Sequence, residues 1–174
     1  MKIYFVTHST TKDNEMDIAS GWNDAGLSQL GIQQARELGD RFENIRVDLI
    51  CCSDLVRATE TVRIAFGSNI PVIIDKRLRE INYGDWNGRS TKMVNSMKTE
   101  RIEEPFPNGE SYKQAISRTH DFYRELKSNY VKKVVLIVGH RATQFGLDTF
   151  TGNRTLEDCL SILLKWQPYW EYEI

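Results

Sequence analysis

Two short apolar runs that each end close to a histidine constrain the fold of this chain more than any other feature. Ile3–Val6 leads into His8, and Val134–Val138 leads through a glycine into His140. Both runs are short and apolar throughout, which is typical of strands that are buried on both faces of a sheet. Because helical patterns separate these runs along the chain, we expect the two histidines to emerge at the same edge of a largely parallel sheet.

The rest of the chain continues this alternation of short strands and amphipathic helices. Periodic apolar positions predict helices over 29–42, 54–66, 91–101, 110–127 and 142–150. Short apolar runs predict further strands over 47–52, 71–74 and 161–166. Ser28 and Ser53 stand where a serine caps a helix N-terminus. This order predicts a single three-layer α/β domain over residues 1–174, with a mostly parallel sheet flanked by helices.

Composition and charge argue against several classes of protein. The 174 residues include 23 basic and 24 acidic side chains, and a net charge of −1 disfavours a nucleic-acid-binding protein with a large basic face. The apolar run after Lys2 is too short for a signal peptide or a membrane span. Three cysteines without a regular spacing are typical of reduced thiols. We therefore expect a cytoplasmic protein with neither nucleic acid nor membrane among its partners.

Three side chains at strand ends point toward phosphate chemistry. A lone histidine is more often a loop residue or a satisfied core group, but His8 and His140 occupy equivalent strand ends. Arg57 falls in the first turns of the helix after the 47–52 strand. Free N–H groups favour anions there, and a guanidinium can hold two phosphate oxygens. Taken alone Arg57 would be interpreted as a solvated surface residue, whereas together the three favour an anion site.

The segment from 81 to 109 breaks the regular pattern with glycines and prolines. A long irregular insert in a compact domain is often a binding loop, so we expect this one to cover the substrate. Its side chains would suit a small organic phosphate with some apolar surface, chiefly Tyr83, Trp86, Arg89 and Lys92.

Four segments also resemble, in order, the motifs of the histidine phosphatase superfamily, which is also called the phosphoglycerate mutase-like family. Residues 7–14 are similar to the family's Arg-His-Gly-x-Thr-x-x-Asn, and residues 53–61 are similar to its second motif. Residues 78–88 are similar to Leu-x-Glu-x-x-x-Gly-x-Trp-x-Gly, and Gly109-Glu110-Ser111 with Val138-Gly139-His140 completes the set. The resemblance covers roughly residues 1 to 150 and implies a phosphoglycerate mutase-like fold.

The resemblance implies a role for each matching residue. His8 is the nucleophile that takes the phosphoryl group, and Glu80 donates a proton to the leaving oxygen and later takes one from water. Arg57 and His140 complete the catalytic set by holding phosphoryl oxygens. Further residues are expected to bind phosphate or substrate, namely Thr7, Ser9, Asn14, Tyr83 and Arg141. The resemblance implies no metal or organic cofactor, and the spacing of the histidines indicates no metal site.

The first segment departs from the family pattern in its charge. Thr7 replaces the family's arginine, which removes one positive charge from the phosphate site, and Ser9 replaces its glycine. Arg141 follows the second histidine, where the family usually has a small residue. We expect its guanidinium to occupy the space that the side chain of residue 7 has vacated. The alternative is that Arg141 points to solvent or pairs with a carboxylate such as Asp148.

The sequence thus predicts metal-independent hydrolysis of a small-molecule phosphomonoester through a phosphohistidine on His8, as in a histidine acid phosphatase-type phosphomonoesterase. Two alternatives stay open. Thr7 motivates a phosphoryl-ligand-binding protein with impaired catalysis, and a phosphomutase is disfavoured by the length of the chain. The expected partner is a small phosphorylated metabolite, and the protein is expected to be a monomer or homodimer. The C-terminal aromatic residues should pack in the core or at a dimer edge; they are Trp166, Tyr169, Trp170 and Tyr172.

Overall fold

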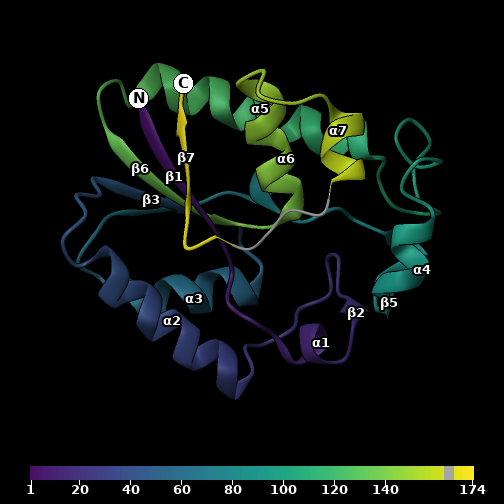
Figure 1. Ribbon diagram of the computed structural model, residues 1–174, viewed down its shortest axis with the longest axis horizontal. Coiled ribbons are helices and arrows are strands. Elements are labelled where there is room, and N and C mark those ends of the chain that lie inside the picture. Colours follow the sequence, from purple (N-terminus) through teal and green to yellow (C-terminus); the bar gives the residue numbers. More distant parts are fainter. Residues whose placement is uncertain (163–166) are drawn as a thin grey trace.

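A five-stranded sheet with the strand order β4-β3-β6-β1-β7 forms the middle layer of the fold (Figure 1). The computed structural model describes residues 1–162 and 167–174. Four strands run parallel, namely β1 (Lys2–Thr7), β3 (Leu49–Cys52), β4 (Val72–Ile74) and β6 (Val134–Gly139). The edge strand β7 (Trp170–Glu173) is antiparallel to β1. The predicted mostly parallel sheet is confirmed.

Two pairs of helices cover the two faces of this sheet (Figure 1). Helices α2 (Gln29–Phe42) and α3 (Val56–Phe66) pack on one face, and α5 (Tyr112–Asn129) and α6 (Arg141–Phe150) pack on the other. Both faces of the sheet are apolar because helices cover both. In strand β1, for example, Phe5 packs toward α5 and α6, while its neighbour Tyr4 packs toward α2. Two layers of helices around a sheet buried on both sides give the expected three-layer arrangement.

The smaller elements gather at the end of the molecule toward which the parallel strands run (Figure 1). They are α1 (Lys12–Glu15), β2 (Ile18–Ala19), the 3₁₀ turns Lys76–Leu78 and Gly84–Trp86, β5 (Arg89–Ser90), α4 (Thr91–Ser96) and α7 (Leu156–Ser161). Strand β2 pairs with β5, so the insert from 81 to 109 is joined to the loop that follows β1. Irregular chain therefore surrounds the carboxyl ends of the parallel strands.

Several predicted boundaries need correction. Helix α3 begins at Val56 rather than residue 54, because Ser53 does not cap it and Leu55 holds the N-cap position. Helix α4 stops at Ser96, well before the predicted end at residue 101. The strand predicted over 161–166 is wrong at Ser161, which ends helix α7, while residues 163–166 lie outside the described residues.

The C-terminal aromatic residues that the structure describes pack within the chain. Tyr172 is buried in the core on the α5 and α6 side. The Tyr169 ring lies 5.2 Å from that of Tyr4, centroid to centroid, and the Trp170 ring lies 5.9 Å from that of Phe5. The core interpretation therefore holds for Tyr172, while Trp166 lies outside the described residues. Within those residues no helix has the length and apolarity that crossing a membrane requires.

Candidate active site

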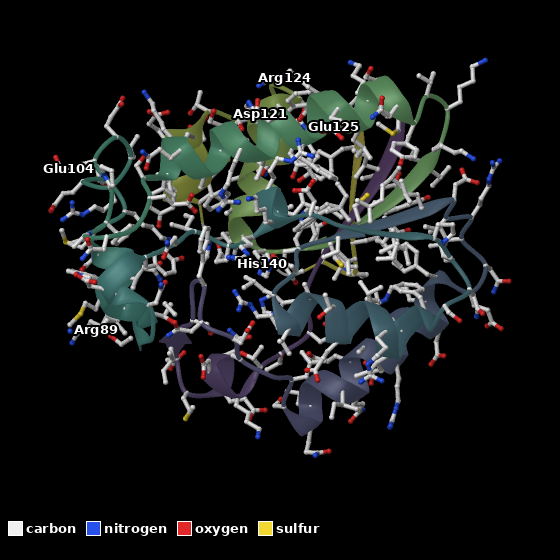
Figure 2. The ribbon with its side chains drawn as sticks, turned by 180° about the vertical axis from the view of Figure 1, so that it is seen from behind. Arg89, Glu104, Asp121, Arg124, Glu125 and His140 are labelled. Carbon is white, nitrogen blue, oxygen red and sulfur yellow. The ribbon has the colours of Figure 1, made fainter. Side chains whose placement is uncertain are left out.

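A cavity of about 350 Å³ opens at the carboxyl ends of the parallel strands. Six of the nine predicted site residues line it, namely His8, Asn14, Arg57, Glu80, Tyr83 and Arg141. They come from segments far apart in sequence, as expected for an edge where several strands of one sheet end. His140 lies in the middle of the molecule, at the end of β6 (Figure 2).

His8 is held in the form that a nucleophile requires. Its Nδ1 donates a hydrogen bond to the Ser9 carbonyl at 2.8 Å, because a carbonyl oxygen can only accept. The proton is thus on Nδ1, and Nε2 keeps its lone pair. Burial, reinforced by the charge of Arg57, lowers the pKa of His8 to about 3. The imidazole is therefore neutral at physiological pH.

His140 lies beside His8, with 5.1 Å between the two ring centroids. It is only 1% exposed and does not line the cavity. Its Nε2 is 2.6 Å from the Ser53 hydroxyl, and its Nδ1 has no hydrogen-bond partner among the described residues. Burial, followed by the charge of Arg57, holds the pKa of His140 well below its ordinary value. The two histidines thus form a neutral, closely packed pair.

Arg57 is the fixed positive charge of the site. It is 2% exposed, and its guanidinium donates to the carbonyls of Gly21 at 2.7 Å and Asn23 at 3.1 Å. Burial lowers the pKa of this guanidinium, although an arginine stays charged at any ordinary pH. No carboxylate forms an ion pair with Arg57 within the described part of the chain. A buried cation held by neutral carbonyls favours an anion in the cavity that it lines.

The carboxylate of Glu80 connects the start of the insert to the start of helix α6 through hydrogen bonds. Its Oε1 accepts hydrogen bonds from the backbone N–H groups of Ile81 at 2.9 Å and Ala142 at 3.1 Å. Its Oε2 accepts from the backbone N–H of Arg141 at 3.1 Å. The first residues of α6 therefore fix the carboxylate at the cavity wall, next to the end of β6.

Arg118 of α5 secures the turn that carries Glu80, and sequence reasoning missed it. Its guanidinium donates to the carbonyls of Arg77 and Arg79, both at 2.8 Å, and of Glu80 at 2.9 Å. It also pairs with the carboxylate of Glu110, which accepts the backbone N–H of Asn82. Arg118 lies mid-helix outside every motif segment, so only its spacing from Glu110 could have indicated this role.

Ser53 is a second residue whose role the sequence analysis missed. It was interpreted as a helix cap, but its hydroxyl is bound to His140. Cys52, just before it, is in register with Val138 on the neighbouring strand β6. Ser53 thus follows directly after a strand, as His140 does. This strand-end position is the sequence feature from which its contact with the site could have been predicted.

Thr7 and Ser9 do not line the cavity of Arg57 and Glu80, contrary to expectation. They line a second cavity, of about 380 Å³, which shares His8 with the first. The Ser9 N–H donates to the Thr61 hydroxyl at 3.0 Å. Arg141 lines the first cavity and Thr7 lines the second, so the two residues do not share one cavity wall. Compensation for the missing arginine by Arg141 stays a prediction.

Other predicted contacts are corrected as well. Asp148 does not pair with Arg141, because its carboxylate accepts hydrogen bonds from Arg154 and Tyr172. In the insert, Tyr83 lines the cavity, whereas Trp86, Arg89 and Lys92 do not. Arg89 lies at the outer side of the molecule (Figure 2). Lys98, just beyond α4, is the cationic residue of the insert that reaches the cavity.

The side chains around the cavity suit an anion better than a cation. Within the described residues, no three His, Cys, Asp or Glu side chains gather in a way that could hold a metal ion. Three cationic residues line the cavity instead, namely Arg57, Lys98 and Arg141. Burial and the charge of Glu80 raise the pKa of Tyr83 well above its ordinary value, so its hydroxyl stays neutral.

Comparison with known proteins identifies the family. The model of the histidine phosphatase superfamily (branch 1) matches residues 3–147. The chain belongs to this superfamily. It is 30% identical over 149 residues to phosphoserine phosphatase 1 of Hydrogenobacter thermophilus, which covers 80% of this chain and 71% of that relative. It is 27% identical over 150 residues to the adenosylcobalamin/alpha-ribazole phosphatase of Escherichia coli, covering 81% and 74%.

A solved structure confirms the fold as well as the family. Bacillus stearothermophilus YhfR superimposes with a TM-score of 0.86 at 27% identity, over 99% of this chain and 91% of that one. The phosphoglycerate mutase-like fold and the family expected from the four motif segments are therefore both confirmed. The named curated relatives above are phosphatases.

Arg118→Lys should weaken both the fold and the activity. A lysine cannot serve three carbonyls and a carboxylate at once, so the free energy of unfolding in urea should fall by about 2 kcal/mol or more. Turnover should fall by roughly tenfold, because the turn that carries Glu80 is held less firmly. The matched control is Arg124→Lys on the same helix, whose exposed pair with Asp121 is worth at most ~1 kcal/mol. Equal effects of the two substitutions would contradict this role for Arg118.

The lowered pKa of His8 should make stability depend on pH. The unfolded chain takes up this proton near pH 6.5, and the folded chain only near pH 3, so stability falls as the pH falls below 6.5. Between pH 7.5 and 5.0 the wild type should lose about 2 kcal/mol more unfolding free energy than His8→Asn. Urea denaturation of both proteins at both pH values measures this difference. An identical pH dependence would show that His8 titrates normally.

Proposed function

We propose that this chain hydrolyses small-molecule phosphomonoesters without a metal ion, carrying the phosphoryl group transiently on His8. One observation carries the proposal. A neutral imidazole with a free Nε2 faces a cavity that is also lined by a buried, immobile guanidinium, that of Arg57, and by the carboxylate of Glu80. These are the parts that a phosphohistidine mechanism needs, namely a nucleophile, a charge sink and an acid–base group.

In the first step, Nε2 of His8 attacks phosphorus and the ester P–O bond breaks. The electron pair leaves with the ester oxygen, and the protonated carboxyl of Glu80 supplies its proton. The imidazole gains positive charge as the N–P bond forms. Its Nδ1–H group already donates to the Ser9 carbonyl, which stabilises that charge and keeps the ring in place.

In the second step, water replaces the imidazole. The Glu80 carboxylate takes a proton from the water as its oxygen attacks phosphorus, and the N–P bond breaks. The electron pair returns to Nε2 of His8, inorganic phosphate leaves, and Glu80 is again protonated. Both steps use the same carboxyl group because the leaving oxygen and the attacking water occupy the same side of the phosphoryl group.

Arg57 neutralises the phosphoryl oxygens in both steps. Its guanidinium is already fixed by the Gly21 and Asn23 carbonyls, so it need not reorganise as negative charge shifts. His140 does not line the cavity, so its proposed part is to pack against the His8 ring, 5.1 Å away between centroids, and to keep that ring in place. Asn14 also lines the cavity and adds a polar group there.

The two alternative functions can be distinguished by what happens to the phosphate. A phosphoryl-ligand-binding protein, which Thr7 motivates, takes up phosphate or vanadate without turnover. A phosphomutase moves phosphate between substrate hydroxyls faster than it moves phosphate to water. The relatives named phosphoserine phosphatase and alpha-ribazole phosphatase support hydrolysis of small phosphorylated compounds.

Release of phosphate from a panel of phosphorylated metabolites in EDTA tests the proposal. The wild type should turn over at least one compound, and vanadate should inhibit it. Glu80→Gln should lower kcat by about 10²- to 10⁴-fold, with vanadate affinity changed far less, because the acid acts on the leaving group. The matched control is Glu104→Gln, an exposed carboxylate at the periphery of the insert, which should leave kcat unchanged (Figure 2). Full activity of Glu80→Gln in EDTA would contradict the mechanism.

A further inference from the structure

Two cationic side chains at the cavity wall have no role in the reaction described above. Lys98 is half-buried just beyond α4, and Arg141 is the first residue of α6. Both line the cavity that holds His8 and Glu80. In the described part of the chain, no carboxylate pairs with either side chain, and residues 163–166 contain no acidic residue.

Two neighbouring cations do have partners within the chain. Lys113 of α5 pairs with Glu103, and the guanidinium of Arg101 donates to the Pro105 carbonyl. Burial, followed by the positive charge of Arg141, lowers the pKa of Lys98. The two unpaired cations are thus close enough to repel each other, and an anion bound between them would relieve that repulsion.

The position of Arg141 indicates which part of the substrate would meet these cations. Its backbone N–H donates to Oε2 of Glu80, and its guanidinium lies over the ring of Phe145, 6.0 Å from the centroid. Phe145 also lines the cavity. Because Glu80 protonates the leaving oxygen in the proposed mechanism, the organic part of the substrate must extend past Glu80, toward Arg141 and Lys98.

We propose that Lys98 and Arg141 form a second anion subsite, which selects phosphomonoesters that carry a further carboxylate or phosphate on the leaving group. This proposal rests on the proposed function, because the mechanism proposed there decides on which side of the cavity the leaving group lies. Arg57 neutralises the transferred phosphoryl group, and the Lys98–Arg141 subsite neutralises the distant anion. Thr91 and Asn95 line the cavity next to Lys98 and add polar groups that suit either anion.

Matched substrates measure the selectivity. Propyl phosphate is compared with 3-phosphooxypropanoate and with 1,3-propanediol bisphosphate, which separate the carboxylate from the phosphate as the preferred second anion. In the wild type, kcat/KM should be roughly 10- to 100-fold higher for at least one of the two anionic esters, the value of one charge-assisted contact. The ratio should fall as salt is added. Equal kcat/KM for all three would overturn the proposal.

Substitution then assigns the preference to the two residues. Lys98→Met and Arg141→Met keep the aliphatic stem and remove the charge, and each should lower the ratio of anionic to uncharged ester by about tenfold. Lys127→Met, at an exposed site in the last turn of α5, is the matched control and should leave the ratio unchanged. A ratio that neither variant lowers would refute the assignment.

Binding keeps this test independent of turnover. Calorimetry compares propylphosphonate with two non-hydrolysable compounds that carry a second anion, 3-phosphonopropanoate and propane-1,3-diyl bisphosphonate. At least one of these two should bind to the wild type about tenfold or more tightly than propylphosphonate. Lys98→Met and Arg141→Met should abolish that difference. If binding follows this pattern and no ester is hydrolysed, the subsite stands and the proposed hydrolysis fails. If esters are hydrolysed and the phosphonates bind equally, the subsite fails alone.

Discussion

The parallel pairing of β1 with β6 is the constraint on which the rest of the site depends. Thr7 is in register with Gly139, and the backbone N–H of His8 donates to the Gly139 carbonyl at 2.9 Å. The two strands are the first and the last of the parallel set along the chain, so their pairing closes a loop of about 130 residues. Once they pair, His8 and His140 leave the sheet side by side, and neither can move without breaking main-chain hydrogen bonds.

Burial then decides the chemistry that this pair can perform. Exposed histidines would be partly protonated near neutral pH, whereas burial beside the charge of Arg57 keeps both rings neutral. Close packing enforces this arrangement, because a Cβ at Gly31 of α2 would lie 1.9 Å from the carbonyl of Thr10, in the loop that carries His8. In the proposed mechanism, the fixed charge of Arg57 attracts the phosphoryl group, and the neutral ring of His8 can attack it without first losing a proton.

The sequence predicted the fold, because short apolar strands and helical periodicity together indicate a parallel sheet covered by helices. His8, Arg57, Glu80 and His140 do lie at the carboxyl edge of that sheet, while their catalytic roles stay a prediction. Sequence reasoning failed where side-chain direction decides the outcome. Thr7 lines a different cavity, and Ser53 is hydrogen-bonded to a histidine instead of capping a helix. Arg118 lies in the middle of a helix and binds backbone carbonyl groups, which a sequence motif does not reveal. Such contacts depend on packing between distant elements, which neither periodicity nor spacing reports.

Whether His8 itself carries the phosphoryl group is best measured by trapping it. The protein is mixed for milliseconds with a ³²P-labelled phosphomonoester that it turns over, quenched in denaturant at alkaline pH, digested, and analysed by peptide mass spectrometry. Label should appear on the peptide that contains His8, at an amount that approaches one phosphoryl group per chain when water attack limits turnover, and it should vanish in His8→Asn. Rapid hydrolysis with no label on that peptide, or undiminished turnover in His8→Asn, would contradict a phosphohistidine at this position.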